Sequence, residues 1–133
     1  MKYLTTPQVL AIHDQMVKRF GGSFGVRDLG LIESAVERPK ATFDGNDLYP
    51  DIFLKAVAIM HSILKNHAFV DGNKRTAYSS CGIFLKINGY QLQNMHKESL
   101  EFALNVENNT LELEEIAAWL KKHSKKKIST PGV

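Results

Sequence analysis

The residues best suited to chemistry lie together in one ten-residue segment, residues 67–76, which reads His-Ala-Phe-Val-Asp-Gly-Asn-Lys-Arg-Thr. His67 is the side chain in it that can exchange a proton near neutral pH. Asp71 is a hard oxygen ligand, and Mg²⁺ usually takes one or two carboxylates together with substrate phosphates. Each residue alone is common at a helix end or in a turn. Their combination within so short a segment is what indicates an active site.

The second half of the segment is suited to bind an anion. Gly72 permits a tight backbone path because it has no Cβ. Asn73, Lys74 and Arg75 begin a predicted helix, whose N-terminus offers N–H groups and a partial positive charge. Lys74 adds a compact charge there, and Arg75 adds a planar fork for phosphate oxygens. The sequence therefore predicts a phosphate-binding turn beside a base, with Phe69 anchoring the loop to the core.

Two apolar helices are predicted to position this segment, one over residues 51–66 and one over residues 73–88. Asp51 is the expected N-cap of the first. The second has no charged residue from Thr76 to Leu85, a pattern typical of a buried helix. Further helices are predicted over residues 6–19, 28–38, 97–107 and 111–123. Without convincing strand alternation, the fold class expected is an all-α, compact bundle of about six helices.

The 133 residues are enough for one domain, expected over residues 1–123. The net charge of +3 comes from five lysines within residues 121–127, so residues 124–133 are expected to form a basic, disordered tail, for which nucleic-acid binding is disfavoured. No apolar run is long enough to span a bilayer. The single cysteine, Cys81, excludes an intramolecular disulfide, and a cytoplasmic protein is expected. The remaining histidines show no metal-ligand spacing and are expected to be structural or exposed: His13, His61, His96 and His123.

Residues 67–76 resemble the signature of the Fic/Doc family, and specifically its Doc (death-on-curing) branch. The resemblance extends to residues 19–39 and to the ending LEEIAAWLKKH, and covers about residues 3–123. It implies a compact helical bundle that uses ATP and Mg²⁺. It implies that His67 is the catalytic base, that Asp71 is tied to the metal, and that residues 72–75 form the anion-binding turn. The catalytic residues so implied are His67, Asp71, Lys74 and Arg75, and those implied to bind the nucleotide are Gly72, Asn73, Lys74 and Arg75.

The resemblance leaves the reaction open between two kinds of group transfer. Fic nucleotidyl transferases usually carry glycine where this chain has Lys74, and often a second arginine where it has Tyr78. Lysine is the Doc pattern, and Doc-type proteins act as kinases that transfer the γ-phosphate of ATP to a threonine of elongation factor Tu. We therefore predict a protein kinase of this type, with AMP transfer as the alternative. A third alternative is an inactive partner-binding module, which the intact His67 disfavours. The chain departs from some Doc proteins at Gly72, where alanine is common, and at Ser79, where asparagine occurs.

Two further expectations concern partners. Many Fic enzymes carry an inhibitory helix with the pattern Ser/Thr-x-x-x-Glu-Gly/Asn, and the nearest segment here, residues 110–114, is followed by Glu115 instead. Restraint by another chain is therefore implied, as by the antitoxin of Phd–Doc pairs, and a groove close to the active site is its expected binding place. The polar loop 41–51 is expected to form a flap over the target peptide.

Overall fold

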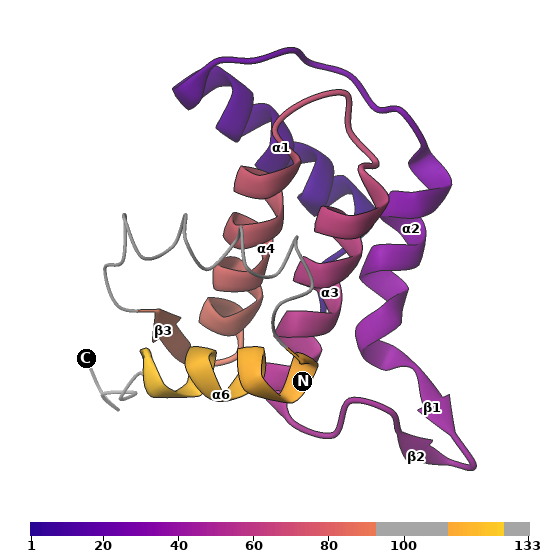
Figure 1. The fold of residues 1–133 in the computed structure, drawn as a ribbon, viewed down its shortest axis with the longest axis vertical. Coiled ribbons are helices and arrows are strands. Elements are labelled where there is room, and N and C mark those ends of the chain that lie inside the picture. The colour runs from indigo at the N-terminus through magenta and orange to yellow at the C-terminus, as the bar shows by residue number, and fades with distance from the viewer. Residues whose placement is uncertain (93–111, 127–133) are drawn as a thin grey trace, which may run out of the picture.

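Helices make up most of the residues that the computed structural model describes, which are 1–92 and 112–126 (Figure 1). The helices are α1 (Thr6–Phe20), α2 (Leu29–Glu37), α3 (Ile52–Asn66), α4 (Asn73–Ile87) and α6 (Leu113–Lys122), with a 3₁₀ turn η1 (Arg38–Lys40) after α2. Four short strands accompany them: β1 (Thr42–Phe43), β2 (Asn46–Asp47), β3 (Tyr90–Leu92) and β4 (Ser124–Lys126). The predicted helical bundle is confirmed. The predicted helix 97–107 lies outside the described residues.

The central pair is α3 and α4, which lie side by side with α1, α2 and α6 packed around them (Figure 1). Because α3 is apolar around most of its circumference, nearly every residue from Phe53 to Leu64 is buried. The small side chains of α4 allow close approach, and its buried face includes Ala77 and Cys81. Burial of Cys81 raises the pKa of its thiol to about 12, so this residue is a core thiol, as predicted, and not a nucleophile.

Local capping sets the helix ends. Asp51 caps α3 as predicted, because its Oδ1 accepts the N–H groups of Phe53 and Leu54 at 2.8 and 2.9 Å. The N-cap of α1 is Thr5, because Thr5 and Gln8 form a reciprocal capping box. Both caps fix where the chain enters the bundle.

The chain after α6 does not begin as a disordered tail. Residues 124–126 form β4, which pairs antiparallel with β3 in the register Tyr90 to Lys126. The expectation of disorder is therefore wrong for these three residues, and residues 127–133 lie outside the described part. Strands of two or three residues show no alternation that sequence reasoning can detect.

The loop 41–51 contains a two-stranded hairpin, β1–β2, fastened to α3 by a buried lysine. Lys55 is 2% exposed, and its ammonium donates to the carbonyl of Pro39 at 2.9 Å and to the carboxylate of Asp47 at 3.3 Å. The hairpin thus lies beside the N-terminal end of α3, whereas His67 follows its C-terminal end, about 22 Å along the helix at 1.5 Å per residue. The expected flap over the target peptide does not agree with this placement (Figure 1).

The Lys55 anchor leads to a stability prediction. Lys55→Met keeps an unbranched side chain in the core but leaves the Pro39 carbonyl without its donor. We expect the free energy of unfolding to fall by about 1–3 kcal/mol. Urea denaturation measures this, and Lys86→Met, which changes an exposed lysine, should stay within about 0.5 kcal/mol of the unmutated protein. Equal effects of the two substitutions would show that the buried contacts of Lys55 contribute nothing.

Candidate active site

The link between α3 and α4, residues 67–72, is buried at its centre and exposed at its chemical groups. His67 ends α3 in the left-handed backbone region, with φ 48°, which turns the chain back toward α4. Phe69 is fully buried, so its predicted role as the anchor of the loop is confirmed. The His67 side chain is exposed and makes no hydrogen bond within the described part of the chain. It is therefore accessible to a substrate.

Asn73 clamps the loop with its side chain. Its Oδ1 accepts the N–H of Phe69 at 3.1 Å, and its Nδ2 donates to the carbonyl of Phe69 at 2.9 Å. The amide is thus engaged on both sides. The backbone N–H of Asn73, in the first turn of α4, is suited to the anion-binding role predicted for this residue, and the second N–H of its Nδ2 is not used by Phe69.

A second segment, residues 21–28, lies along the loop, and we call it the strap. It joins α1 to α2 (Figure 1), Val26 forms an antiparallel bridge with Phe69, and the N–H of Val70 donates to the carbonyl of Gly25 at 3.1 Å. The carbonyl of Ala68 accepts two strap N–H groups at 2.7 and 3.1 Å, those of Arg27 and Asp28. The strap therefore satisfies backbone groups that the buried loop cannot satisfy by itself.

The strap also sets the orientation of the Asp71 carboxylate. Oδ2 of Asp71 accepts the N–H of Ser23 at 3.1 Å, and Oδ1 accepts the N–H of Gly72 at 2.8 Å. Gly22 permits this approach, because a Cβ there would lie 2.7 Å from Oδ2. The carboxylate is held by two backbone donors while it stays exposed to solvent.

The loop is supported from below by His13 of α1. This residue is 2% exposed, its ring is stacked on Phe69 with centroids 3.9 Å apart, and its Nε2 lies 2.7 Å from the carbonyl oxygen of Asp71. His13 was expected to be either structural or exposed, and its burial shows that it is structural. What sequence reasoning missed is the contact with the site, and the available signal was a histidine next to Ile12 on the apolar face of α1.

Two cations follow the loop at the start of α4, and both are exposed, as an anion site requires. The guanidinium of Arg75 lies 4.4 Å over the ring of Phe20 and donates to the Phe20 carbonyl at 3.3 Å. Since Arg has five N–H donors, this bond leaves others for phosphate oxygens. Lys74 lies one residue before it, so Asp71, the N-terminus of α4 at Asn73, Lys74 and Arg75 all lie within five residues of the chain.

The single carboxylate of Asp71 fits a metal ion that is bound mainly through the phosphates of its substrate. Within residues 1–92 and 112–126, no three His, Cys, Asp or Glu side chains are grouped to hold a metal ion. Asp71 offers one exposed carboxylate, and two accepted hydrogen bonds leave about half of its roughly four lone-pair positions. Mg²⁺ bound by one carboxylate plus nucleotide phosphates needs no more than this.

Other histidines are engaged away from the loop. His61 contacts Arg38 through Nδ1 at 2.9 Å, and burial, together with the charges of Arg38 and Lys65, lowers its pKa. His123 is stacked on Trp119 and lies 2.8 Å from its carbonyl oxygen through Nδ1. Both agree with the structural role predicted for them.

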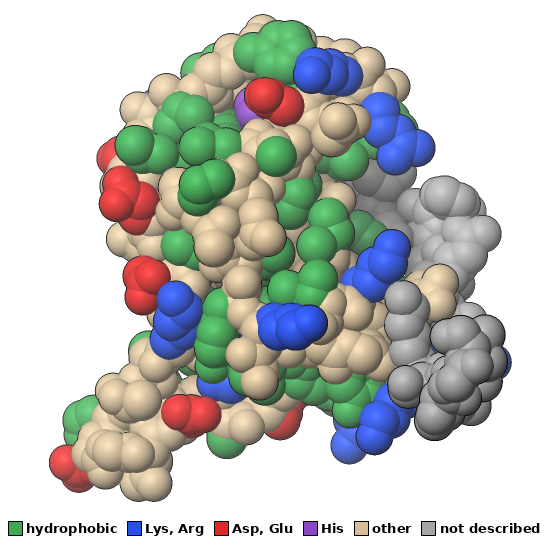
Figure 2. Space-filling view, turned by 180° about the vertical axis from the view of Figure 1, so that it is seen from behind, with side chains coloured by type: hydrophobic (Ala, Val, Ile, Leu, Met, Phe, Trp, Pro, Cys, Tyr) green, Lys and Arg blue, Asp and Glu red, His purple; other side chains and the backbone are tan. Residues whose placement is uncertain are grey.

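Exposed apolar side chains surround the site. Figure 2 shows hydrophobic side chains gathered in the upper part of the molecule, the end that carries the strap and the loop. Phe24 of the strap is 56% exposed and Val70 of the loop is 52% exposed. Others belong to the ends of α1 and α2 and to the strap: Phe20, Leu29 and Val26. Such a rim around polar groups is typical of a protein-binding surface.

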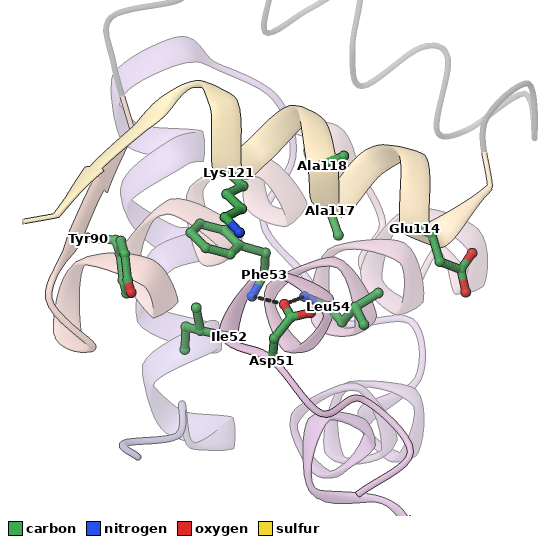
Figure 3. Close-up of a pocket in the computed structure, with 9 residues that line it drawn as sticks. All are labelled: Asp51, Ile52, Phe53, Leu54, Tyr90, Glu114, Ala117, Ala118 and Lys121. Atoms are coloured by element: carbon green, nitrogen blue, oxygen red, sulfur yellow. Dashed lines mark hydrogen bonds between the residues drawn. The ribbon is translucent and has the colours of Figure 1, made fainter.

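A cavity of about 460 Å³ lies elsewhere, between the start of α3, α6 and Tyr90 (Figure 3). Ile52 and Phe53 line it from α3, and Ala117 and Lys121 from α6. It is at the opposite end of α3 from His67, so it does not provide the groove expected close to the active site.

Among the described helices, none has the length and apolar character needed to cross a bilayer.

Comparison with known proteins agrees with this fold and loop. The model of the family described as Fic/DOC matches residues 3–85, which include the strap, the loop and most of α4. The chain therefore belongs to the Fic/DOC family. Two relatives place it in the Doc branch, as the loop sequence indicated.

The first of these relatives is "Toxin Doc" of Mycolicibacterium smegmatis, 55% identical over 73 residues, which are 55% of this chain and 56% of that protein. The second is "Protein kinase doc" of Escherichia phage P1, 32% identical over 92 residues, which are 69% of this chain and 72% of that protein. The match with this chain thus covers only about half the length of the first relative.

The contact between the strap and Asp71 can be tested with two neighbouring glycines. Gly22 and Gly21 both have positive φ, 112° and 85°, so alanine is strained at either position. A Cβ at Gly22 would also meet Asp71, whereas a Cβ at Gly21 meets nothing within 4 Å. We expect Gly22→Ala to lower the free energy of unfolding by about 1–3 kcal/mol more than Gly21→Ala, as measured by chemical denaturation. If the two variants are equally stable, the strap does not hold Asp71.

Proposed function

We propose that this protein is a Doc-type toxin, a protein kinase that transfers the γ-phosphoryl group of ATP to a threonine hydroxyl of a translation factor such as elongation factor Tu. The observation that supports this most is the order of groups along one rigid loop. An exposed base, His67, is followed by a fixed carboxylate, Asp71, and then by a helix N-terminus that carries Lys74 and Arg75. The printed name of the phage P1 relative, a protein kinase, supports the same chemistry.

In the proposed reaction, His67 accepts the proton of the target hydroxyl while that oxygen attacks the γ-phosphorus. The new oxygen–phosphorus bond forms as the bond to the β,γ-bridging oxygen breaks, and ADP leaves with that electron pair. The exposed position of His67 allows a protein side chain to reach it. The N–H groups at the start of α4 and the charges of Lys74 and Arg75 stabilise the phosphate oxygens.

Asp71 is the residue that would hold Mg²⁺. When bound, the ion neutralises charge on the phosphate oxygens. The bonds from Ser23 and Gly72 keep the Asp71 carboxylate in one orientation, so little reorganisation is needed when the nucleotide binds. Gly72, Asn73, Lys74 and Arg75 then bind the phosphates.

AMP transfer is the alternative chemistry on the same site, and it would use the same base and carboxylate. We favour phosphoryl transfer because Lys74 takes up space and adds charge where Fic nucleotidyl transferases usually carry glycine. Tyr78, one turn after Lys74 and half-buried, supplies no second cation. An inactive binding module is disfavoured because His67 is both present and accessible.

The proposed restraint is an antitoxin of the Phd type that covers the active site in the cytoplasm. Val70 lies between His67 and Asp71 in the chain, and the strap that carries Phe24 and Val26 pairs with this loop. The three exposed side chains form an apolar rim, which suits an amphipathic helix better than a polar ligand. Neither membrane attachment nor direct nucleic-acid binding forms part of the proposal.

His67→Ala tests the base. We expect phosphorylation of the target protein to fall by about 10²–10⁴-fold, because a positioned base contributes that much to the rate. Quantitative mass spectrometry of the target measures the phosphate added. The variant should keep its melting temperature and its affinity for ATP, since the His67 side chain makes no hydrogen bond within the described residues. A variant that phosphorylates at the full rate contradicts the assignment.

Lys74→Gly tests why phosphoryl transfer is favoured over AMP transfer. We expect loss of phosphate transfer and a weak gain of AMP transfer, because glycine opens the anion site while Tyr78 still supplies no charge. Lys74→Ala is the matched control, since it removes the same charge but keeps a Cβ. Intact-mass spectrometry of the target separates added phosphate from added AMP. Undiminished phosphate transfer by Lys74→Gly would show that Lys74 does not set the orientation of the nucleotide.

A further inference from the structure

His13 is a buried polar residue that neither the motif nor the proposed reaction explains. It lies on α1, 58 residues before Asp71, and is 2% exposed. Two contacts hold it under the loop. Its ring is stacked almost parallel on Phe69, with 8° between the planes, and its Nε2 lies 2.7 Å from the carbonyl oxygen of Asp71.

The second contact shows that Nε2 of the ring is a donor. A carbonyl oxygen can only accept, so Nε2 of His13 carries the hydrogen and donates it. The side chain must therefore be flat enough to stack on Phe69 and must present an N–H at its far edge. Among the uncharged side chains, phenylalanine meets the first requirement and glutamine the second, but neither meets both.

The hydrogen bond from His13 to the Asp71 carbonyl lies where it can influence both the Asp71 carboxylate and the start of α4. The Asp71 carbonyl belongs to the same peptide unit as the N–H of Gly72, and that N–H donates to Oδ1 of Asp71 at 2.8 Å. Gly72 is also the N-cap of α4, and a Cβ there would meet the His13 ring at 3.6 Å. One rigid peptide unit thus links His13 to the carboxylate and to the start of the anion-binding helix.

We propose that His13 is a positioning residue for the metal and phosphate site: by donating to the Asp71 carbonyl, it fixes the 71–72 peptide and so aims the Asp71 carboxylate. This proposal rests on the proposed function, because that function gives Asp71 its metal. His13 touches neither substrate nor metal. Groups that orient a metal ligand from behind typically change metal affinity or activity by about 10- to 100-fold when removed.

The test compares His13→Phe, which keeps the stack and loses the donor, with His13→Gln, which keeps a donor. The chain offers a matched control in His123, whose ring is likewise stacked on an aromatic ring, that of Trp119, and bonded to a carbonyl, but on α6. His123→Phe removes the same kind of hydrogen bond away from the loop. Melting temperatures of the variants show whether each one folds.

The main measurement is the Mg²⁺ concentration that gives half-maximal ATP binding, by calorimetry without any protein target. We expect His13→Phe to raise this concentration by about 10- to 100-fold, while His13→Gln and His123→Phe stay within a few-fold of the unmutated protein. An unchanged concentration in His13→Phe overturns the proposal. So does an equal shift in His13→Phe and His123→Phe, which would indicate a general loss of stability.

A second measurement separates this proposal from the kinase assignment. Hydrogen exchange of the Gly72 amide, followed by NMR without nucleotide, should become at least several-fold faster in His13→Phe and not in His123→Phe, because that amide lies in the peptide that His13 fixes. If the unmutated protein transfers no phosphate, the kinase proposal fails while this measurement still decides the role of His13. Unaltered exchange in a folded His13→Phe variant overturns that role.

Discussion

The loop between α3 and α4 must bury its centre while it presents charged groups at its surface, and the polar groups of its backbone need partners. Phe69 supplies the apolar anchor, and the side chain of Asn73 satisfies both backbone groups of Phe69. The strap adds bonds to Ala68 and Val70. These contacts hold the loop in the observed conformation, and the proposed chemistry depends on that conformation.

The two ends of the loop are held to different degrees. Asp71 is fixed by Ser23, by Gly72 and, through its carbonyl, by His13. The His67 side chain makes no hydrogen bond to any of the described residues, and its left-handed backbone sets its direction. This difference suits the proposed reaction, because a metal ligand gains from rigidity, whereas a base must adjust to a hydroxyl group that arrives on another protein.

Sequence reasoning succeeded where the signal is local. The uncharged face of α4, the N-cap Asp51 and the apolar Phe69 are each read from neighbouring residues, and the motif itself is contiguous. It failed where the partner is distant in sequence. Ser23 meets Asp71 only because the strap lies along the loop, and no periodicity encodes that contact.

A partner distant in sequence also explains why loop 41–51 was wrongly expected to cover the target peptide. The polar composition of loop 41–51 indicates exposure, and the hairpin strands are indeed exposed. Its location is set instead by Lys55, a charged residue in a buried helix that sequence patterns treat only as an interruption. The roles of His67, Asp71 and Lys74 remain predictions that chemistry must test.

The proposed reaction at this loop transfers the terminal phosphoryl group of ATP to a protein. The most direct measurement incubates the unmutated protein with a bacterial lysate and ATP that carries a radioactive label on either the α- or the γ-phosphate. We expect one protein band to acquire the γ-label and not the α-label, and we expect His67→Ala to prevent this. Transfer of the α-label would instead establish AMP transfer and rule out the kinase reaction.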